Sequence, residues 1–375
     1  MWIGVERTIP YIYGVLEGLG VEVRYFGAAE LAGGGVKGVE VLVIRSINKC
    51  GRKELEGSGV KLVVTASVGE DHIDKEYCAG AGIGWRNAAG SNARSVGEYV
   101  LGSLMELEVR GGAGMWSGKT VGIVGVGHVG KEVSKLSKAI GMEVLLNDPP
   151  RAAAEGGAGF VELEEIARSA DVITFHTPLT EGGRWGTKHL LNGRLVELLE
   201  RKPYVINASR GGVCEPAALI RGRREGKIGG LVIDCWEGEP GISEELLGVA
   251  DIGTPHIAGF SVEGKVNAVK SCVEWVGEYA GVGEEKRRAA LGRVEVPASR
   301  EEEIDMEEFK DKRIARAVLR VNSLGAIDKR LRSGVRSFEE LRRTYSHPRE
   351  IGGYRVVHAG AGEGEVLRRL GFRVE

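Results

Sequence analysis

Three polar residues whose types suit catalysis each follow an apolar stretch of the chain. Arg210 comes directly after PYVINAS, Glu239 after LVIDCWEG and His256 after DIGTP. Such apolar stretches are typical of buried parallel strands, and open α/β sheets build their sites at the carboxyl ends of these strands. We therefore expect the three side chains to gather at one edge of a sheet.

An arginine, a histidine and a carboxylate together offer the chemistry that hydride transfer from a hydroxy acid requires. A guanidinium group presents a planar fork to the carboxylate of the substrate. An imidazole titrates near neutral pH and suits a general base for the hydroxyl proton. A neighbouring carboxylate fixes the orientation of that ring and favours its protonated form. Loss of the hydroxyl proton lets the hydrogen on C2 leave as a hydride to a nicotinamide.

Each of these three residues also has a purely structural interpretation. Arg210 precedes two glycines and could be a loop cation. Glu239 precedes Pro240 and could be a turn acid. His256 could be a hydrogen-bonded structural histidine. Their occurrence together after successive strands favours the catalytic interpretation.

A glycine-rich turn joins the strand-like stretch KTVGIV to a helix-like stretch. The turn matches the pattern GxGxxG and consists of Gly125, Val126, Gly127, His128, Val129 and Gly130. The first glycine permits a tight turn, the second lets the backbone approach a pyrophosphate, and the third lets the helix pack close to the strand. The first N–H groups of the helix then face the anion. The turn predicts a dinucleotide site, with an ordinary strand–helix turn as the alternative.

An acidic residue follows the next strand. Asp148 lies 18 residues after Gly130, at the end of MEVLLND. A carboxylate there would accept hydrogen bonds from the ribose hydroxyls of NAD and repel the 2′-phosphate of NADP. Asp148 could instead only cap the turn before Pro149, and Arg151 could favour NADP. The position at the strand end favours NAD.

Strand-like and helix-like stretches alternate through most of the chain and would position these residues. Apolar runs over 36–45 and 60–67 predict two buried strands with a short helix between them. Further predicted strands are KTVGIV, MEVLLND, DVITFHT, PYVINAS and GGLVID, and helices are predicted over 95–109, 128–141, 163–170, 192–200 and 216–226. The alternation predicts at least five parallel strands with covering helices, a doubly wound Rossmann-type sheet.

The last third of the chain has a different character. A helix is predicted over 262–279, and the charged stretch 281–303 is interpreted as a linker. Two helices, over 306–319 and 338–345, then precede a final β-α-β-like run, YRVVHAG, GEGEVLRRLG and FRVE. This arrangement predicts a small α+β domain at the C-terminus.

The composition excludes several classes of function. The chain has 375 residues and a net charge of −2, without the basic excess that marks nucleic-acid binding. Its five cysteines are widely spaced and form no CxxC motif, which argues against a zinc site or a disulfide framework. This use of cysteine favours a cytoplasmic setting. We expect no metal, no signal peptide and no membrane span.

The stretches INASRGG, DCWEGEP and TPHIAG, with the glycine turn VGIVGVGHVG, resemble the signature stretches of the D-isomer-specific 2-hydroxyacid dehydrogenase family. The resemblance implies that Arg210, Glu239 and His256 are catalytic. It also implies a flavodoxin-like substrate domain over 1–93, completed by 258–283, and an NAD-binding domain over 94–257.

Within this family, the stretches NDPPR, ITFHTPLT, HIAGFSVEGK and FEELRRTY resemble members that have a C-terminal extension. The resemblance implies that 284–375 form a linker and a dimerisation domain, and that the protein is a homodimer. It also implies oxidation of 4-phospho-D-erythronate with NAD, a step in the biosynthesis of pyridoxal 5′-phosphate.

Further site residues are implied by the positions that match the family. Substrate-binding positions correspond to Ser46, Ser67 and Phe260, and further cofactor positions correspond to Thr177, Asp234 and Gly259. Phe260 stands where the family usually has tyrosine, and Ser67 replaces a usual threonine while keeping a hydroxyl. Ser46 and Ser67 each follow a predicted strand, so both could instead be turn-capping serines.

Two other functions are compatible with the sequence. One is a dehydrogenase of the same family that acts on an unphosphorylated acid such as glycerate or lactate. The other is a non-catalytic module that senses NAD. A module of this second kind has no need for Arg210, Glu239 and His256 at successive strand ends.

Overall fold

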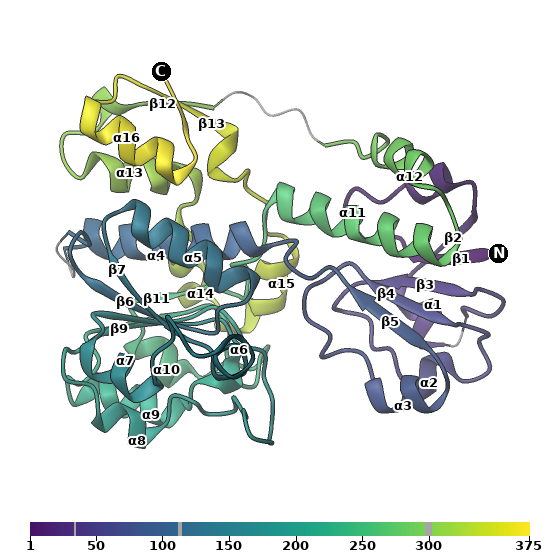
Figure 1. Ribbon diagram of the computed structural model, residues 1–375, viewed down its shortest axis with the longest axis horizontal. Coiled ribbons are helices and arrows are strands. Elements are labelled where there is room, and N and C mark those ends of the chain that lie inside the picture. Colours follow the sequence, from purple (N-terminus) through teal and green to yellow (C-terminus); the bar gives the residue numbers. More distant parts are fainter. Residues whose placement is uncertain (34, 112–114, 297–301) are drawn as a thin grey trace. The chain divides into compact units, whose positions relative to one another are not determined.

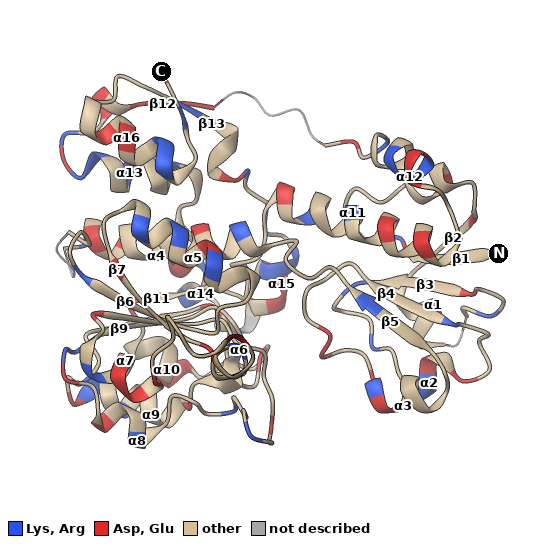
Figure 2. Ribbon diagram, viewed as in Figure 1, with Lys and Arg blue, Asp and Glu red and all other residues tan. Residues whose placement is uncertain are grey.

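The structure is a computed structural model that describes residues 1–33, 35–111, 115–296 and 302–375. The chain divides into two compact units, one of residues 1–92 with 261–298 and the other of residues 93–260 with 299–375. In the described residues, no helix is long and apolar enough to cross a membrane. Basic and acidic residues are interspersed over the elements, in keeping with the small net charge (Figure 2).

The first unit is built on a five-stranded sheet in which all neighbouring strands are parallel (Figure 1). In spatial order the strands are β2 (Glu22–Phe26), β1 (Trp2–Glu6), β3 (Val41–Ile44), β4 (Leu62–Thr65) and β5 (Gly84–Asn87). Its helices are η1 (Leu16–Leu19), α1 (Ala28–Ala32), α2 (Arg52–Leu55), α3 (Lys75–Gly80), α11 (Val262–Tyr279) and α12 (Glu284–Leu291). Separate apolar cores, one of them shared with α11, lie on the two faces of this sheet.

The second unit is built on a six-stranded parallel sheet. In spatial order the strands are β11 (Ile252–Gly253), β10 (Gly230–Ile233), β9 (Tyr204–Asn207), β8 (Val172–Phe175), β6 (Thr120–Val124) and β7 (Glu143–Asn147). The chain leaves β6 for β7 on one side and then crosses to β8 on the other. Ligands of open α/β sheets bind at such a switch point, outside the carboxyl ends of the strands.

Helices cover both faces of this second sheet, as a doubly wound fold requires (Figure 1). They are α4 (Ala93–Val109), α5 (His128–Ala139), α6 (Pro149–Glu155), α7 (Leu163–Ser169), α8 (Gly193–Glu197), η2 (Gly211–Val213), α9 (Pro216–Arg224) and α10 (Glu244–Val249). The helices α4 and α5 lie over one face, and α7 to α10 over the other. The predicted Rossmann-type fold is thereby confirmed.

The C-terminal part of this unit has a small parallel sheet of its own, in the order β12 (Glu302–Asp305), β13 (Tyr354–Val357) and β14 (Arg373–Val374). Its helices are η3 (Met306–Glu308), α13 (Arg313–Val321), α14 (Leu324–Ser333), η4 (Val335–Ser337), α15 (Phe338–Arg343), η5 (Ile351–Gly353) and α16 (Ala361–Leu370). The helix α13 packs on α4, α16 packs on α5, and α14 packs on β11.

Two predictions about the last third of the chain were wrong in detail. Part of the stretch expected to be a linker forms α12. Its buried Ala290 packs against Gly18 of η1, and a Cβ atom added to Gly18 would lie 2.9 Å from Ala290. Residues 297–301 of that stretch lie outside the described residues. The helix expected over 306–319 is interrupted, because Asp305 caps a 3₁₀ turn and Lys312 adopts a left-handed conformation with φ of 46°.

An ionisable pair ties α4 to the C-terminal part. Arg94 Nε lies 2.6 Å from Glu98 Oε1, and the Glu98 carboxylate accepts the Ile351 N–H at 3.0 Å. Arg94 also donates to the carbonyl of Leu370, at the end of α16. Burial, opposed by Arg94 and reinforced by Glu350, raises the pKa of Glu98 to about 7. This carboxyl group is therefore harder to ionise in the folded chain than in the unfolded one.

We predict that Glu98 makes the protein less stable as pH rises. Because the folded-state pKa lies above the ordinary value of 4.5, the unfolded chain loses this proton first, and stability falls between about pH 4.5 and 7. In Glu98→Gln, which keeps the acceptor for Ile351, this decline is absent, and the two proteins diverge by up to about 3 kcal/mol. Urea unfolding at pH 5, 6, 7 and 8 measures the difference, and parallel pH curves would contradict the prediction.

Candidate active site

The glycine turn after β6 is shaped by backbone contacts that only glycine allows. Gly125 has φ of 89°, and a Cβ atom there would lie 2.7 Å from the carbonyl of His176, just after β8. A Cβ atom on Gly130 would lie 2.1 Å from the carbonyl oxygen of Gly125. The first of these glycines thus permits the turn, and the other lets α5 start directly against it.

The same turn leaves one side open. Gly127 and His128 are exposed, and a Cβ atom on Gly127 would meet nothing within 4 Å. Gly127 is the N-cap of α5, so the first N–H groups of the helix, including those of His128 and Val129, have no carbonyl partner within the helix. An open helix N-terminus at the switch point between β6 and β8 fits a pyrophosphate.

Asp148 lies beside this turn, where the sequence places it. One of its carboxylate oxygens accepts the Val126 N–H at 2.8 Å and the other accepts the Arg151 N–H at 3.1 Å, which caps α6. The guanidinium group of Arg151 is held by Glu155 and by the carbonyl of Val126. The capping interpretation of Asp148 is correct, and its proposed hydrogen bonds to a ribose remain a prediction.

A buried hydroxyl group at the same place supports a bound nucleotide. Thr177 follows β8, and its methyl group would lie 2.9 Å from a Cβ atom on Gly125. Its Oγ1 atom is buried and has no hydrogen-bond partner in the described part of the chain. Such a group is costly unless a ligand satisfies it. The glycine cradle and this unpaired hydroxyl fit the predicted dinucleotide.

Two of the predicted catalytic residues form a tight pair. His256 Nδ1 lies 2.5 Å from Glu239 Oε1, and both side chains are about three-quarters buried. The other oxygen of Glu239 accepts the Trp236 N–H at 3.2 Å. Burial opposes ionisation of Glu239, but the hydrogen bond and charge of His256 outweigh it and lower the pKa of this carboxyl group. Glu239 is therefore a carboxylate, and the imidazole keeps Nε2 for a substrate.

A fully buried carboxylate fixes the loop that carries His256. Asp234, at the end of β10, accepts the Thr254 hydroxyl at 2.7 Å and the N–H groups of Ile257 and Ala258 at 2.8 and 3.0 Å. His256 has a left-handed backbone with φ of 53°, and its N–H bonds to the Asp234 carbonyl at 2.9 Å. The structure thus gives Asp234 a role in positioning His256, while its contact with the cofactor remains a prediction.

Arg210 comes to the same edge of the sheet because of the glycine that follows it. A Cβ atom on Gly211 would lie only 2.0 Å from the carbonyl carbon of Trp236, so the chain after β9 runs directly against the chain after β10. Arg210 is half-buried and donates to the carbonyl of Ser209 at 2.8 Å. Its charge reaches Cys235, whose thiol pKa is raised by burial and lowered in part by Arg210.

Phe260, predicted to bind substrate, lies in the same unit as His256. Its ring is 5.5 Å from that of His347 and 6.3 Å from that of Tyr345, both in the C-terminal part. The adjacent Gly259, predicted to bind cofactor, is half-buried. No feature of the sequence indicated that residues so distant along the chain meet Phe260.

The two predicted substrate serines belong to the other unit and follow neighbouring strands. Ser46 comes after β3 and is exposed. Ser67 comes after β4, and its hydroxyl lies 2.7 Å from that of Thr65 and donates to the Gly69 carbonyl at 3.0 Å. The capping interpretation therefore describes Ser67 better than the exposed Ser46.

The structure contains a second histidine–glutamate pair, which the sequence did not indicate, and its glutamate lies two residues before Glu239. His189 Nε2 lies 3.0 Å from Glu237 Oε1, and both side chains are about one-third exposed. The stretch DCWEGEP thus supplies two glutamates to two histidines. Only the coordinates distinguish them, because no local pattern links His189 to this loop.

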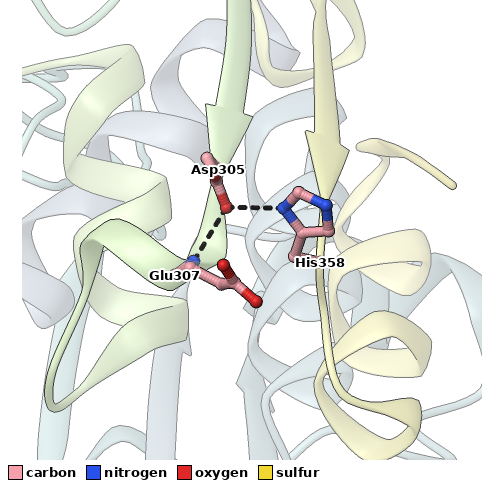
Figure 3. Close-up of side chains that lie close together, drawn as sticks. All are labelled: Asp305, Glu307 and His358. Carbon is pink, nitrogen blue, oxygen red and sulfur yellow. Dashed lines mark hydrogen bonds and ion pairs between the residues drawn. The ribbon is translucent and has the colours of Figure 1, made fainter.

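One further cluster, in the C-terminal part, has the composition of a metal site. The ligand atoms of Asp305, Glu307 and His358 lie within 4.8 Å of one another (Figure 3). Asp305 already pairs with His358 Nδ1 at 2.9 Å and accepts the Glu307 N–H at 2.9 Å. The Glu307 N–H and His358, with a smaller contribution from the cation of Arg313, lower the pKa of Asp305. The cluster is therefore an ion pair capping a turn and carries no argument for a metal.

Residues 108–258 match the D-isomer specific 2-hydroxyacid dehydrogenase, NAD binding domain. The chain is 41% identical over 373 residues to the erythronate-4-phosphate dehydrogenase of Porphyromonas gingivalis, covering 99% of this chain and 100% of that one. It also resembles the solved D-lactate dehydrogenase of Aquifex aeolicus, with a TM-score of 0.60 and 25% identity over 80% of this chain and 100% of that one. The 3-phosphoglycerate dehydrogenase of Entamoeba histolytica has the same fold, with a TM-score of 0.63 and 24% identity over 75% and 95%.

These matches, with the glycine turn and the histidine–glutamate pair, define an NAD-dependent dehydrogenase. The chain belongs to the D-isomer-specific 2-hydroxyacid dehydrogenase family, and its cofactor is NAD. The match to the Porphyromonas gingivalis protein extends through the C-terminal part, which distinguishes it from the structural matches that cover three-quarters to four-fifths of the chain.

We predict that removing the charge of Asp148 relaxes the preference for NAD over NADP. Asp148→Asn keeps one acceptor oxygen for the Val126 or the Arg151 N–H, loses the other, and no longer repels a 2′-phosphate. The ratio of kcat/KM for NAD to that for NADP should fall by about tenfold or more. Steady-state rates with each cofactor measure this ratio. An unchanged ratio in Asp148→Asn, with Asp148→Ala giving the same result, would contradict a role at the ribose.

Proposed function

We propose that this protein oxidises 4-phospho-D-erythronate at C2, with NAD as the hydride acceptor, and forms 2-oxo-3-hydroxy-4-phosphobutanoate. The observation that carries the proposal is the 41% identity, over essentially the whole of both chains, to an erythronate-4-phosphate dehydrogenase. His256, whose Nδ1 atom lies 2.5 Å from Glu239, is the base that the reaction needs. Dehydrogenation of an unphosphorylated acid and NAD sensing without turnover have no comparable support.

The mechanism follows from the direction of the His256 ring. Its Nδ1 atom faces the Glu239 carboxylate and carries a proton, so Nε2 is the basic nitrogen. In the proposed reaction Nε2 takes the proton of the C2 hydroxyl group, and the resulting imidazolium is stabilised by Glu239. Arg210 holds the substrate carboxylate with its guanidinium fork. The chemistry that NAD supplies when bound is acceptance of the hydride from C2.

The remaining site residues keep the roles expected from the sequence. The cofactor site of the proposal consists of Gly125, Gly127, His128, Val129, Gly130, Asp148, Thr177, Asp234 and Gly259. The substrate site adds Ser46, Ser67 and Phe260 to the catalytic residues. The open glycine cradle and the unpaired hydroxyl of Thr177 support the first set.

We further propose a homodimer in the cytoplasm that serves the biosynthesis of pyridoxal 5′-phosphate. The five cysteines are buried and free, which is consistent with a reducing compartment. The C-terminal part, a small parallel sheet with its helices, is the proposed dimerisation domain. The proposed domains are 1–93 with 258–283 for substrate, 94–257 for NAD, and 284–375 for the linker and dimerisation, except that α12 at the start of this last range packs in the first unit.

We predict that His256→Ala and Arg210→Ala each abolish most turnover of 4-phospho-D-erythronate. Loss of a general base costs about 10²- to 10⁴-fold in kcat. Loss of the carboxylate fork weakens transition-state binding, while the glycine cradle, and hence NADH binding, is unaffected. Steady-state rates and NADH fluorescence titration measure the two effects.

A matched control is His358→Ala, which also removes a histidine paired with a carboxylate but lies outside the proposed site. It should keep full activity. Near wild-type rates in His256→Ala would contradict the assigned role of this residue. Wild-type protein that binds NADH but oxidises 4-phospho-D-erythronate no faster than glycerate would overturn the proposed function.

A further inference from the structure

The helix α15 brings an arginine of the C-terminal part to the ring of Phe260. The guanidinium carbon of Arg342 lies 5.7 Å from the ring centroid, within the range of a cation–π contact. His347 and Tyr345, a few residues further on, contact the same ring. Phe260 follows His256 by four residues, so this contact connects the C-terminal part to the catalytic loop.

Arg342 has no anion of its own. In the described part of the chain, no hydrogen bond or ion pair joins its side chain to another residue, and its Nε atom is buried without an acceptor. By contrast, Arg332 of the neighbouring helix α14 bonds to Asp328 at 2.8 Å and to two backbone carbonyls. A half-buried guanidinium group without a partner is costly, so its place in the structure calls for an anion supplied from outside.

The charge of Arg342 is felt at the catalytic residues. Together with His256, it helps to lower the pKa of Glu239, against the effect of burial. Together with Arg210, it offsets part of the rise that burial causes in the pKa of the Cys235 thiol. Arg210 and Arg342 therefore approach the end of β10 from different elements. The carboxylate of Glu239, which lies just after this strand, is already paired with His256.

We propose that Arg342 binds the phosphate group of the substrate and thereby sets the preference for a phosphorylated hydroxy acid. The inference rests on the proposed function, in which the substrate carries a carboxylate at one end and a phosphate at the other. Arg210 takes the carboxylate. Arg342 offers the second fork, since a guanidinium group binds phosphate through two parallel N–H donors. The contact with the Phe260 ring places the guanidinium group of Arg342 beside this residue.

The proposal also gives a role to the C-terminal part within its own chain. Residues 338–343 carry both signs of charge, and Figure 2 shows α15 with acidic and basic segments. Arg343, the neighbour of Arg342, is exposed, and within the described residues it makes no such ring contact. Two adjacent arginines on one short helix therefore provide a matched pair, of which only one approaches Phe260.

The test compares Arg342→Gln with Arg343→Gln in the full-length protein. The KM for 4-phospho-D-erythronate should rise about 10- to 100-fold in Arg342→Gln, the range expected for loss of a charged hydrogen bond. Its kcat and its affinity for NADH should change less than about threefold. The inhibition constant of D-erythronate, which lacks the phosphate, should be unaffected. Arg342→Lys keeps the charge but not the fork, so its KM should be intermediate.

The outcomes separate this inference from the proposed function. If the wild-type protein fails to oxidise 4-phospho-D-erythronate, the proposed function is wrong. If the wild-type protein oxidises it and the KM changes less than twofold in Arg342→Gln and Arg342→Lys, the inference alone is wrong. A loss of kcat at constant KM would instead make Arg342 a positioning residue for Glu239, and an equal effect of Arg343→Gln would indicate only a general loss of surface charge. Both of these results overturn the inference.

Discussion

The buried carboxylate of Asp234 is the constraint on which the active site depends. It lies at the end of β10 with no exposed surface, and its oxygens accept the hydroxyl of Thr254 and the N–H groups of Ile257 and Ala258. Without it, two buried N–H groups would lack acceptors, at a cost comparable to that of lost hydrogen bonds. These hydrogen bonds fix the loop from Thr254 to Ala258. His256, within this loop, has a left-handed backbone, and its imidazole contacts Glu239.

The central parallel sheet and its glycine turn could be predicted from sequence because both depend on local patterns. Alternating apolar and helical stretches define β6 to β10, and the spacing of Gly125, Gly127 and Gly130 meets a requirement within a single strand–turn–helix. The grouping of Arg210, Glu239 and His256 could be predicted in the same way, because the carboxyl ends of parallel strands meet at one edge of a sheet. Arg210 lies beside that edge because of the close approach at Gly211.

The remaining features depend on contacts between distant parts of the chain, for which no local pattern exists. The pairing of His189 with Glu237, and of Phe260 with Arg342, arises only when separate loops and helices pack. The helix α12 was missed because its sequence is mostly charged, and its one buried residue, Ala290, packs against Gly18. The helix α14 was missed as well. Its Asp328 accepts the Gly253 N–H of β11, a contact between segments that are distant along the chain.

A crystal structure of the protein with NADH and 4-phospho-D-erythronate tests the central claim most directly. We predict that the C2 hydroxyl oxygen lies within about 2.6–3.2 Å of His256 Nε2, with the carboxylate on Arg210 and the nicotinamide beside C2. We also predict that the His256–Glu239 contact is retained. A substrate bound with its hydroxyl group away from His256, or with Glu239 turned from the imidazole, would contradict the account.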